Sequence, residues 1–182
     1  MKATGIVRRI DDLGRVVVPK EIRRTLRIRE GDPLEIYTDR EGGIILRKYS
    51  PIGELSQFSK QYAEALAQNT GYIVSITDRD QHIAVAGAGK KDLAKKAISR
   101  QMDTLMNQRE SLLAVKGERK FIPITEDGGE NYTAQVIYPI IAEGDAIGTV
   151  ILTTKDDKVR MGEMEMKLAA SAASFLGRQL EQ

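Results

Sequence analysis

The side chains best suited to chemistry in this sequence are arginines that gather near its N-terminus. The first 29 residues carry nine lysines and arginines against three acids, a local balance of +6, although the formal net charge of the whole chain is only +2. Seven of those nine cations are arginine, whose planar guanidinium makes bidentate contacts with phosphates and with the guanine edge. The pattern favours binding of a polyanion, above all nucleic acid, over a surface that is merely solvated.

Four arginines are the candidate contacts because they fall in three neighbouring predicted elements. Arg8 lies in the first predicted strand, and Arg15 follows the turn after it, close to a short helix that carries Arg23 and Arg24. Neighbouring helical residues point about 100° apart, so Arg23 and Arg24 lie away from the apolar side of that helix or beside it.

The elements that position these arginines form a small unit, which we assign to residues 1–52. β-branched and alternating apolar residues predict strands, Gly14 allows a positive φ in the first turn, and Pro19 suits the first position of a helix. So small a unit buries too little apolar surface alone, and we expect it to dimerise. In chain order the prediction is strand 5–10, turn 11–14, strand 15–18, helix 20–27, strand 34–37, turn 41–43 and strand 44–49.

The predicted boundary lies at Ser50–Gly53, and residues 53–182 are expected to form a second, α/β domain. Apolar residues at helical spacing begin and end this domain, and strand patterns with turn residues between them fill its middle. The predicted elements are a helix from 55 to 70, strands 72–77 and 82–86, a helix 92–108, strands 121–124, 133–141 and 146–154, and a helix 161–180.

The last predicted helix carries two apolar stripes side by side. Together with the stripe of the first helix in this domain, they offer more apolar surface than one sheet covers, so we expect the excess to pair between chains. The first stripe is Met164, Leu168, Ala172 and Phe175, and the second is Ala169, Ala173, Leu176 and Leu180.

No constellation typical of an enzyme emerges from the sequence. Cysteine is absent, which excludes disulfides and thiol catalysis and is typical of a reducing compartment. His82 is the only histidine and has no neighbour that suggests a metal site, so we interpret it as structural. We therefore predict no catalytic residue, no metal and no cofactor.

Two further motifs are better explained by turns than by ligands. The segment 87–90 is glycine-rich, but the Walker pattern requires glycine where Ala84 stands and Ser or Thr where Lys91 stands. Asp78 and Asp80 have the spacing of a metal pair, yet carboxylates at these positions are equally typical of a turn.

The run TGIVRRIDDLGRVVVPKEIRRTLRIREGDPLEIY, from Thr4 to Tyr37, resembles the AbrB-type swapped-hairpin DNA-binding domain. In that family two chains interleave their hairpins into one mainly-β, barrel-like dimer with short helices at its edges. The resemblance covers about the first 50 residues. It implies contacts with double-stranded DNA from Arg8, Arg15, Arg23 and Arg24, and from Arg9, where a lysine is common.

The remainder resembles a GAF domain, in which helices flank a central antiparallel sheet. The run YPIIAEGDAIGTVIL, from Tyr138 to Leu152, is similar to the GAF hairpin of two inner strands joined through Gly144, with Gly148 leading the second. GAF domains commonly bind small molecules, so the resemblance implies an effector of unknown identity. No bilin-attachment cysteine or cyclic-nucleotide pattern is found here.

A swapped-hairpin domain followed by a GAF domain is the plan of developmental transcription regulators of spore-forming bacteria. This resemblance implies activation of some late forespore genes and repression of others. We expect a dimer through the N-terminal hairpins, a tetramer through the GAF helices, and a nucleoid-associated protein of the cytoplasm. No apolar run approaches the ~20 residues that span a bilayer, and a signal-peptide core is absent, so neither a membrane nor export is expected.

Three alternatives are weighed against this interpretation. Swapped-hairpin domains also serve in antitoxins, but those usually end in a short disordered tail, unlike the foldable C-terminal domain predicted here. A GAF-type enzyme such as a methionine sulfoxide reductase would need thiol chemistry, which a chain without cysteine lacks. A purely structural assembly protein would show no salt-sensitive affinity for DNA.

Overall fold

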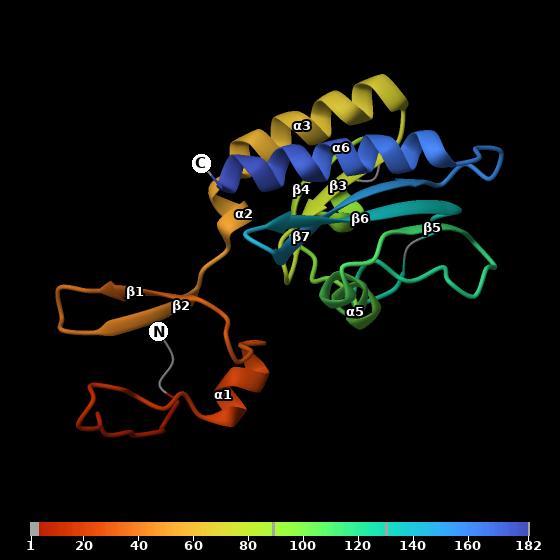
Figure 1. The fold of residues 1–182 in the computed structure, drawn as a ribbon. Coiled ribbons are helices and arrows are strands. Elements are labelled where there is room, and N and C mark those ends of the chain that lie inside the picture. The colour runs from red at the N-terminus through yellow and green to blue at the C-terminus, as the bar shows by residue number, and fades with distance from the viewer. Residues whose placement is uncertain (1–3, 89, 130, 182) are drawn as a thin grey trace. The chain divides into compact units, whose positions relative to one another are not determined.

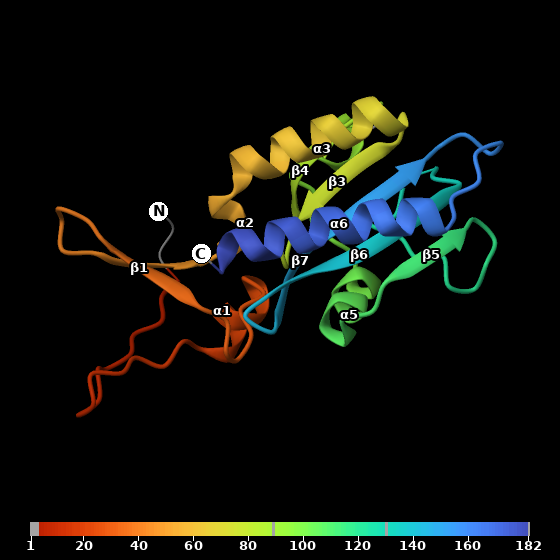
Figure 2. The ribbon, with the colours of Figure 1, turned by 45° about the horizontal axis from the view of Figure 1, so that its top comes forward.

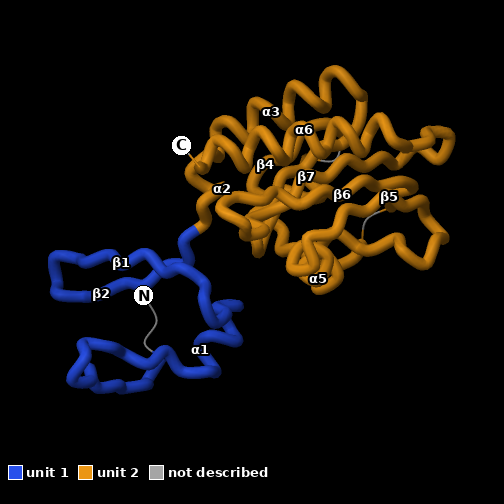
Figure 3. The backbone as a smooth tube through the Cα atoms, viewed as in Figure 1, with its two compact units in different colours: residues 1–49 blue, residues 50–182 orange. Residues whose placement is uncertain are grey.

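Two compact units make up the chain. The computed structural model describes residues 4–88, 90–129 and 131–181. Contacts divide the chain into residues 1–49, which we call the head, and residues 50–182, which we call the body (Figure 3). Ile52, within the range expected for the head, is fully buried in the core of the body.

The head contains one short helix and one β-hairpin. Helix α1 spans Lys20–Thr25 and follows Pro19, whose fixed φ suits a helix start. Strands β1 (Leu34–Thr38) and β2 (Ile44–Lys48) pair antiparallel. The Asp39 carboxylate closes their turn, because its Oδ1 accepts from the backbone N–H of Gly43 at 2.7 Å. These elements were predicted from the sequence, with α1 ending two residues earlier than expected.

The two N-terminal strands predicted at 5–10 and 15–18 do not form as strands in the single chain. Both segments lack ladder partners within the described head, although the turn between them forms, with Gly14 N–H donating to Asp11 C=O at 3.0 Å. Their apolar side chains are correspondingly exposed: Val7 is 85% exposed and Val17 69%. A strand needs a neighbour to satisfy its backbone groups, and one chain does not supply it.

The body is an antiparallel sheet of five strands with helices on both faces (Figures 1 and 2). The strand order is β4-β3-β7-β6-β5, so both strands of the long β6–β7 hairpin are inner strands, with β4 and β5 at the edges. The strands are β3 (Ile73–Thr77), β4 (His82–Ala86), β5 (Leu112–Val115), β6 (Ala134–Ala142) and β7 (Asp145–Thr154). The helices are α2 (Pro51–Glu54), α3 (Ser56–Thr70), α4 (Lys90–Leu93), α5 (Arg100–Gln108) and α6 (Glu163–Leu180).

Each face of the sheet has its own apolar core. On one face α3 and α6 pack against the sheet over residues such as Val136 and Leu152, both fully buried. On the other face α5 packs over Ile137 and Ile151, also fully buried. Strand alternation places successive residues on opposite faces, which explains how neighbouring positions serve different cores.

Close packing of the sheet and α6 requires glycine at two positions. A Cβ on Gly148 would come within 2.0 Å of the Thr77 carbonyl oxygen, and one on Gly177 within 2.1 Å of the Ile141 carbonyl oxygen. Gly148 was singled out from the sequence, whereas the contact of Gly177 was not foreseen.

Three local predictions for the body were wrong. The helix expected over 92–108 is interrupted, because Lys95 adopts φ 62° and the chain around Ala97 and Ile98 forms isolated β-bridges. Ser99 then caps α5 by accepting the Met102 N–H at 3.0 Å. The segment 121–124 is not a strand, and β5 was missed, because four residues give too short a pattern to recognise.

The two predicted stripes of α6 have different surroundings. Ala169, Ala172, Ala173 and Leu176 are buried against the sheet. Met164 is 71% exposed and Phe175 is 39% exposed, so these two lie on the outer side of the helix. Surplus apolar surface is therefore present, but the first stripe supplies it rather than the second.

Candidate nucleic-acid interface

Arg15 is held at the tip of the N-terminal turn by Asp11. The Asp11 Oδ1 accepts the backbone N–H of Arg15 at 2.8 Å and that of Leu13 at 3.0 Å, while its Oδ2 pairs with the Arg15 Nε at 2.8 Å. The Arg15 backbone N–H, and then its guanidinium, lower the pKa of Asp11. The Arg15 side chain is nevertheless 69% exposed. The turn thus presents an ordered cation to solvent.

Arg23 and Arg24 lie on α1, as predicted, and because the helix ends at Thr25 they occupy its last turn. The Arg23 Nε donates to the Val18 carbonyl at 3.2 Å, so Arg23 is half-buried and ties the helix to the segment before it. Arg24 is exposed. Cations in the last turn also interact favourably with the helix dipole.

Arg8 and Arg9 lie in the extended segment before the turn, and both are exposed. The Arg8 guanidinium contacts the neighbouring Val7 carbonyl at 3.3 Å. All five predicted arginines are therefore in the head, four of them exposed. Asp11, which orients Arg15, was not assigned that role from the sequence, although its position at the start of an Asp-Asp-Leu-Gly turn was a usable signal.

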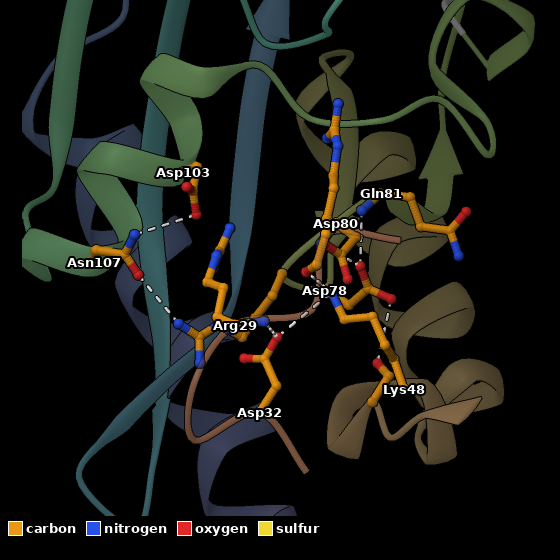
Figure 4. A network of polar contacts seen from close by, with 11 residues as sticks. Arg29, Asp32, Lys48, Asp78, Asp80, Gln81, Asp103 and Asn107 are labelled. Atoms are coloured by element: carbon orange, nitrogen blue, oxygen red, sulfur yellow. Dashed lines mark hydrogen bonds and ion pairs between the residues drawn. The ribbon is translucent and has the colours of Figure 1, made fainter. Parts of the chain in front are cut away.

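The aspartates of the β3–β4 turn make the contacts of a turn (Figure 4). The Asp78 Oδ1 accepts the backbone N–H groups of Asp80 and Gln81, each at 2.7 Å, and Asp78 Oδ2 accepts from the Ser50 hydroxyl at 3.3 Å. Burial raises the pKa of Asp78, and the two backbone donors oppose that shift. Of the residues that the structure describes, no three His, Cys, Asp or Glu gather as a metal site.

His82 is a buried structural residue, with 1% of its surface exposed. Its Nε2 lies 3.3 Å from the Ile124 carbonyl and its Nδ1 lies 2.7 Å from the Ser75 Oγ. A carbonyl only accepts, so Nε2 carries a proton, and in the neutral ring Nδ1 then accepts from the Ser75 hydroxyl. Burial lowers the pKa of His82 to about 4, in agreement with that assignment.

The glycine-rich segment after β4 shows a close backbone approach. Gly87 has φ 90°, and a Cβ there would lie 2.6 Å from the Tyr72 carbonyl oxygen. Gly89 in the same motif lies outside the described residues. Within the described ranges, no helix is long and apolar enough to cross a membrane.

Gln135 was missed by the sequence analysis. It lies on β6 opposite Thr153 of β7 and is 1% exposed. Neither its Nε2 nor its Oε1 has a hydrogen-bond partner within the described residues. A buried amide without partners is costly, and the alternation of β6 gave no sign that this polar residue would face inward.

A basic head followed by an α/β body is the arrangement of a class of two-domain DNA-binding regulators. A family model described as "Stage V sporulation protein T C-terminal, transcription factor" matches residues 54–181, and one described as "Antidote-toxin recognition MazE, bacterial antitoxin" matches residues 7–54. The chain is 54% identical over 182 residues to stage V sporulation protein T of Bacillus subtilis (strain 168), covering 100% of both. The chain belongs to the stage V sporulation protein T family of transcription factors.

Similarity to two further proteins bears on the plan of the chain. Over 112 residues the chain is 42% identical to the transition state regulatory protein AbrB of Bacillus subtilis (strain 168). The alignment covers 62% of this chain and 97% of AbrB. The structure is similar to the PixJ GAF-domain of Thermosynechococcus elongatus, with a TM-score of 0.58 at 12% identity, over 74% of this chain and 89% of that one. The predicted plan of an AbrB-like head and a GAF-like body with an antiparallel sheet is confirmed, and the antitoxin alternative is not favoured.

Proposed function

We propose that this transcription factor regulates late, forespore-stage sporulation genes, activating some promoters and repressing others, and that Arg8, Arg9, Arg15, Arg23 and Arg24 contact double-stranded DNA. The observation that carries the proposal is the ordered presentation of Arg15 by Asp11, in a head whose short helix α1 carries two further arginines in its last turn. Guanidinium groups held in this way neutralise phosphates without first having to be ordered.

A second copy of the chain is the natural partner of the head. None of its described residues is buried, and its unpaired segments expose large apolar side chains such as Val7 and Val17. Covering one side chain of this kind contributes roughly 1.5–3 kcal/mol, so an interleaved dimer would gain substantially. We therefore propose a dimer through the N-terminal hairpins, with ten candidate arginines on its surface.

The decisive experiment is a salt titration of DNA affinity with the full chain. If about six phosphates are neutralised per dimer, log affinity should fall with log salt at a slope of roughly −5. Arg15→Ala should weaken binding and make the slope shallower while leaving the thermal melt unchanged. A slope near zero for the natural chain would contradict the proposal, and a collapsed melt for Arg15→Ala would assign that arginine a structural role.

We further propose that the body joins two head dimers into a tetramer through α3 and α6. Met164 and Phe175 on α6 and Phe58 on α3 are exposed, with Phe58 50% accessible, and Phe175 stacks on Tyr62 with ring centroids 5.3 Å apart. The exposed apolar side of α6 faces solvent in the single chain, which is the arrangement expected of an interface between copies.

A charge on the exposed stripe should split this tetramer. Met164→Asp should give dimers in sedimentation, whereas Ser174→Asp, a charge at an exposed polar position of the same helix, should leave the tetramer intact. Leu176 is unsuitable for this test because it is fully buried in the body's own core. The proposal would be contradicted if the natural protein sediments as a dimer, or if the Met164→Asp variant stays tetrameric.

The remaining features of the proposal concern the body and the place of action. We propose that the protein has no enzymatic activity and associates with the nucleoid in the cytoplasm. An effector is proposed for the α5 side of the sheet, supported by the unpartnered amide of Gln135. Such a compound should raise the melting temperature of the natural chain by mass action and should have less effect on Gln135→Leu.

A further inference from the structure

The residues on either side of the division between head and body each have a hydrogen bond within their own unit. Tyr49 is fixed in the head, where its backbone N–H donates to the Pro33 carbonyl at 3.0 Å. Ser50, the next residue, is fixed in the body, where its Oγ donates to the Asp78 Oδ2 at 3.3 Å. Two consecutive residues are thus held by two different units.

Ser50 is fixed at a second point in the body. Its Oγ also accepts the Gly53 backbone N–H at 3.2 Å, which caps the short helix α2. Ile52 in that helix is fully buried in the core shared by the sheet, α3 and α6. The start of the body is therefore anchored by one apolar and two polar contacts.

Asp78 in turn belongs to a rigid part of the sheet. It is 9% exposed, and its other oxygen accepts two backbone N–H groups of the β3–β4 turn. Thr77 directly before it shares a buried hydrogen bond with Thr149 of β7, Oγ1 to Oγ1 at 2.8 Å. An acceptor supported in this way holds Ser50 in one orientation.

We propose that Ser50 and Asp78 are positioning residues for DNA binding: their hydrogen bond fixes the direction in which the chain leaves the body. In an assembly of several chains it therefore sets which spacing of two DNA sites the linked heads occupy together. This inference rests on the proposed function, because it requires heads that bind DNA and bodies that link them. Neither residue belongs to the arginine set that contacts DNA.

The test compares DNA duplexes that carry one site with duplexes that carry two. The site is a duplex selected by the natural full chain from a random-sequence pool, and the two-site probes place two copies at centre spacings stepped by one base pair over about one helical turn of ~10 base pairs. Linked heads gain from a raised effective concentration only where geometry permits both contacts, so two-site affinity should vary about tenfold with spacing.

Three variants separate positioning from folding. Ser50→Ala removes the bond to Asp78 and the side-chain cap of α2. Insertion of Gly-Ser after Tyr49 keeps every contact of Ser50 and only makes the backbone between Tyr49 and Ser50 longer and more flexible. Ser50→Thr keeps a hydroxyl and should behave as the natural chain. In Ser50→Ala and in the insertion, single-site affinity should stay within about twofold, whereas the spacing dependence should fall below about threefold, because a flexible connection reaches many spacings with less gain at each.

The outcomes are distinguishable. Full spacing dependence in Ser50→Ala or in the insertion would overturn the positioning role. If the natural chain binds single sites but its two-site affinity does not vary with spacing, the positioning role is also overturned, while DNA binding by the head stands. Failure of the natural chain to bind any single site would instead contradict the proposed function itself, and the positioning role with it.

Discussion

The head and the body differ in how completely one chain builds them. In the body, each face of the sheet has a core of fully buried side chains, such as Val136 on one face and Ile137 on the other. In the head, no described residue is buried, and α1 lacks a buried residue altogether. The body therefore has a buried core of its own, whereas the head leaves exposed the apolar side chains that a complete domain would bury.

Polar side chains also differ between the units, in that the body pairs some of them in its interior. Thr77 pairs with Thr149 and Ser75 with His82 there, while exposed ion pairs such as Lys155–Asp92 lie on the body's surface. In the head the Asp11–Arg15 pair lies at the surface, with the guanidinium directed to solvent. Buried pairs specify a structure, while an ordered exposed cation is available to bind.

The largest expected effect comes from crowding the body at Gly148. Gly148→Ala would place a Cβ 2.0 Å from the Thr77 carbonyl oxygen, inside the sheet, where neither strand can move freely. We expect a loss of at least ~3 kcal/mol of unfolding free energy, measured by chemical denaturation of the full chain.

Two matched glycines sharpen this prediction. Gly129→Ala in a body loop has no atom within 4 Å of the new Cβ and should change stability by less than ~0.5 kcal/mol. Gly14→Ala in the head also meets no atom, but Gly14 has φ 75°, so the cost should be about 1 kcal/mol of backbone strain. Equal effects at Gly148 and Gly129 would show that the packing of β3 against β7 is looser than described.

The second expected effect is acid destabilisation of the body through His82. Its folded pKa of about 4 lies below the usual 6.5, so the folded state resists protonation that the unfolded chain accepts. Stability from this group is therefore complete above pH 6.5 and is lost as the pH falls towards 4, by about 3 kcal/mol in total.

The control is His82→Gln, which removes the only imidazole of the chain. Asp78 has a raised pKa and contributes with the opposite sign, so the difference between natural chain and variant isolates the histidine. Urea unfolding at several pH values should show a steeper loss in the natural chain. If the unfolding free energy falls equally with pH in the natural chain and in His82→Gln, His82 is protonated in the folded body without loss of stability.

The third effect concerns the head and is seen in binding rather than in stability. Arg23→Ala combined with Arg24→Ala should lower DNA affinity by about 100-fold, since each arginine at a phosphate or base edge contributes on the order of 1–3 kcal/mol. Arg100→Ala, at an exposed position of α5, should leave affinity unchanged. A comparable loss from Arg100→Ala would place a DNA contact on the body and remove the contrast between the two units.

Elements that carry their own signal were predictable from the sequence. The β6–β7 hairpin follows from two long apolar runs around Gly144, which has φ 84°, and α3 ends where expected, at Gly71 with φ 75°. The position of α1 follows from Pro19 and the apolar residues after it. In each case local pattern and tertiary packing favour the same structure.

Features that depend on distant partners were not predictable. The break between α4 and α5 occurs because the chain near Ala97 and Ile98 bridges to Gln81 and Thr125, far away in the sequence. The Ser50 hydroxyl donates to Asp78, which lies 28 residues later in the sequence. The two segments predicted as N-terminal strands have no strand partner within the described head, and the pattern of one sequence does not tell whether a strand pairs within its own chain or with a second copy.

The smallest expected effect tests whether the head's turn is built only to hold Arg15. Asp11→Ala removes the acceptor of two backbone N–H groups and of the Arg15 Nε, so Arg15 would lose its fixed orientation. DNA affinity should fall about fivefold, which is the cost of ordering one long side chain on binding. Asp11→Asn keeps the Oδ1 acceptor and removes a negative charge beside the polyanion, so its affinity should equal or exceed that of the natural chain. Thermal melts of both variants should match the natural one, since the body dominates them. If Asp11→Asn binds as weakly as Asp11→Ala, the ion pair between Asp11 Oδ2 and Arg15 Nε, rather than the backbone contacts of the turn, orients Arg15.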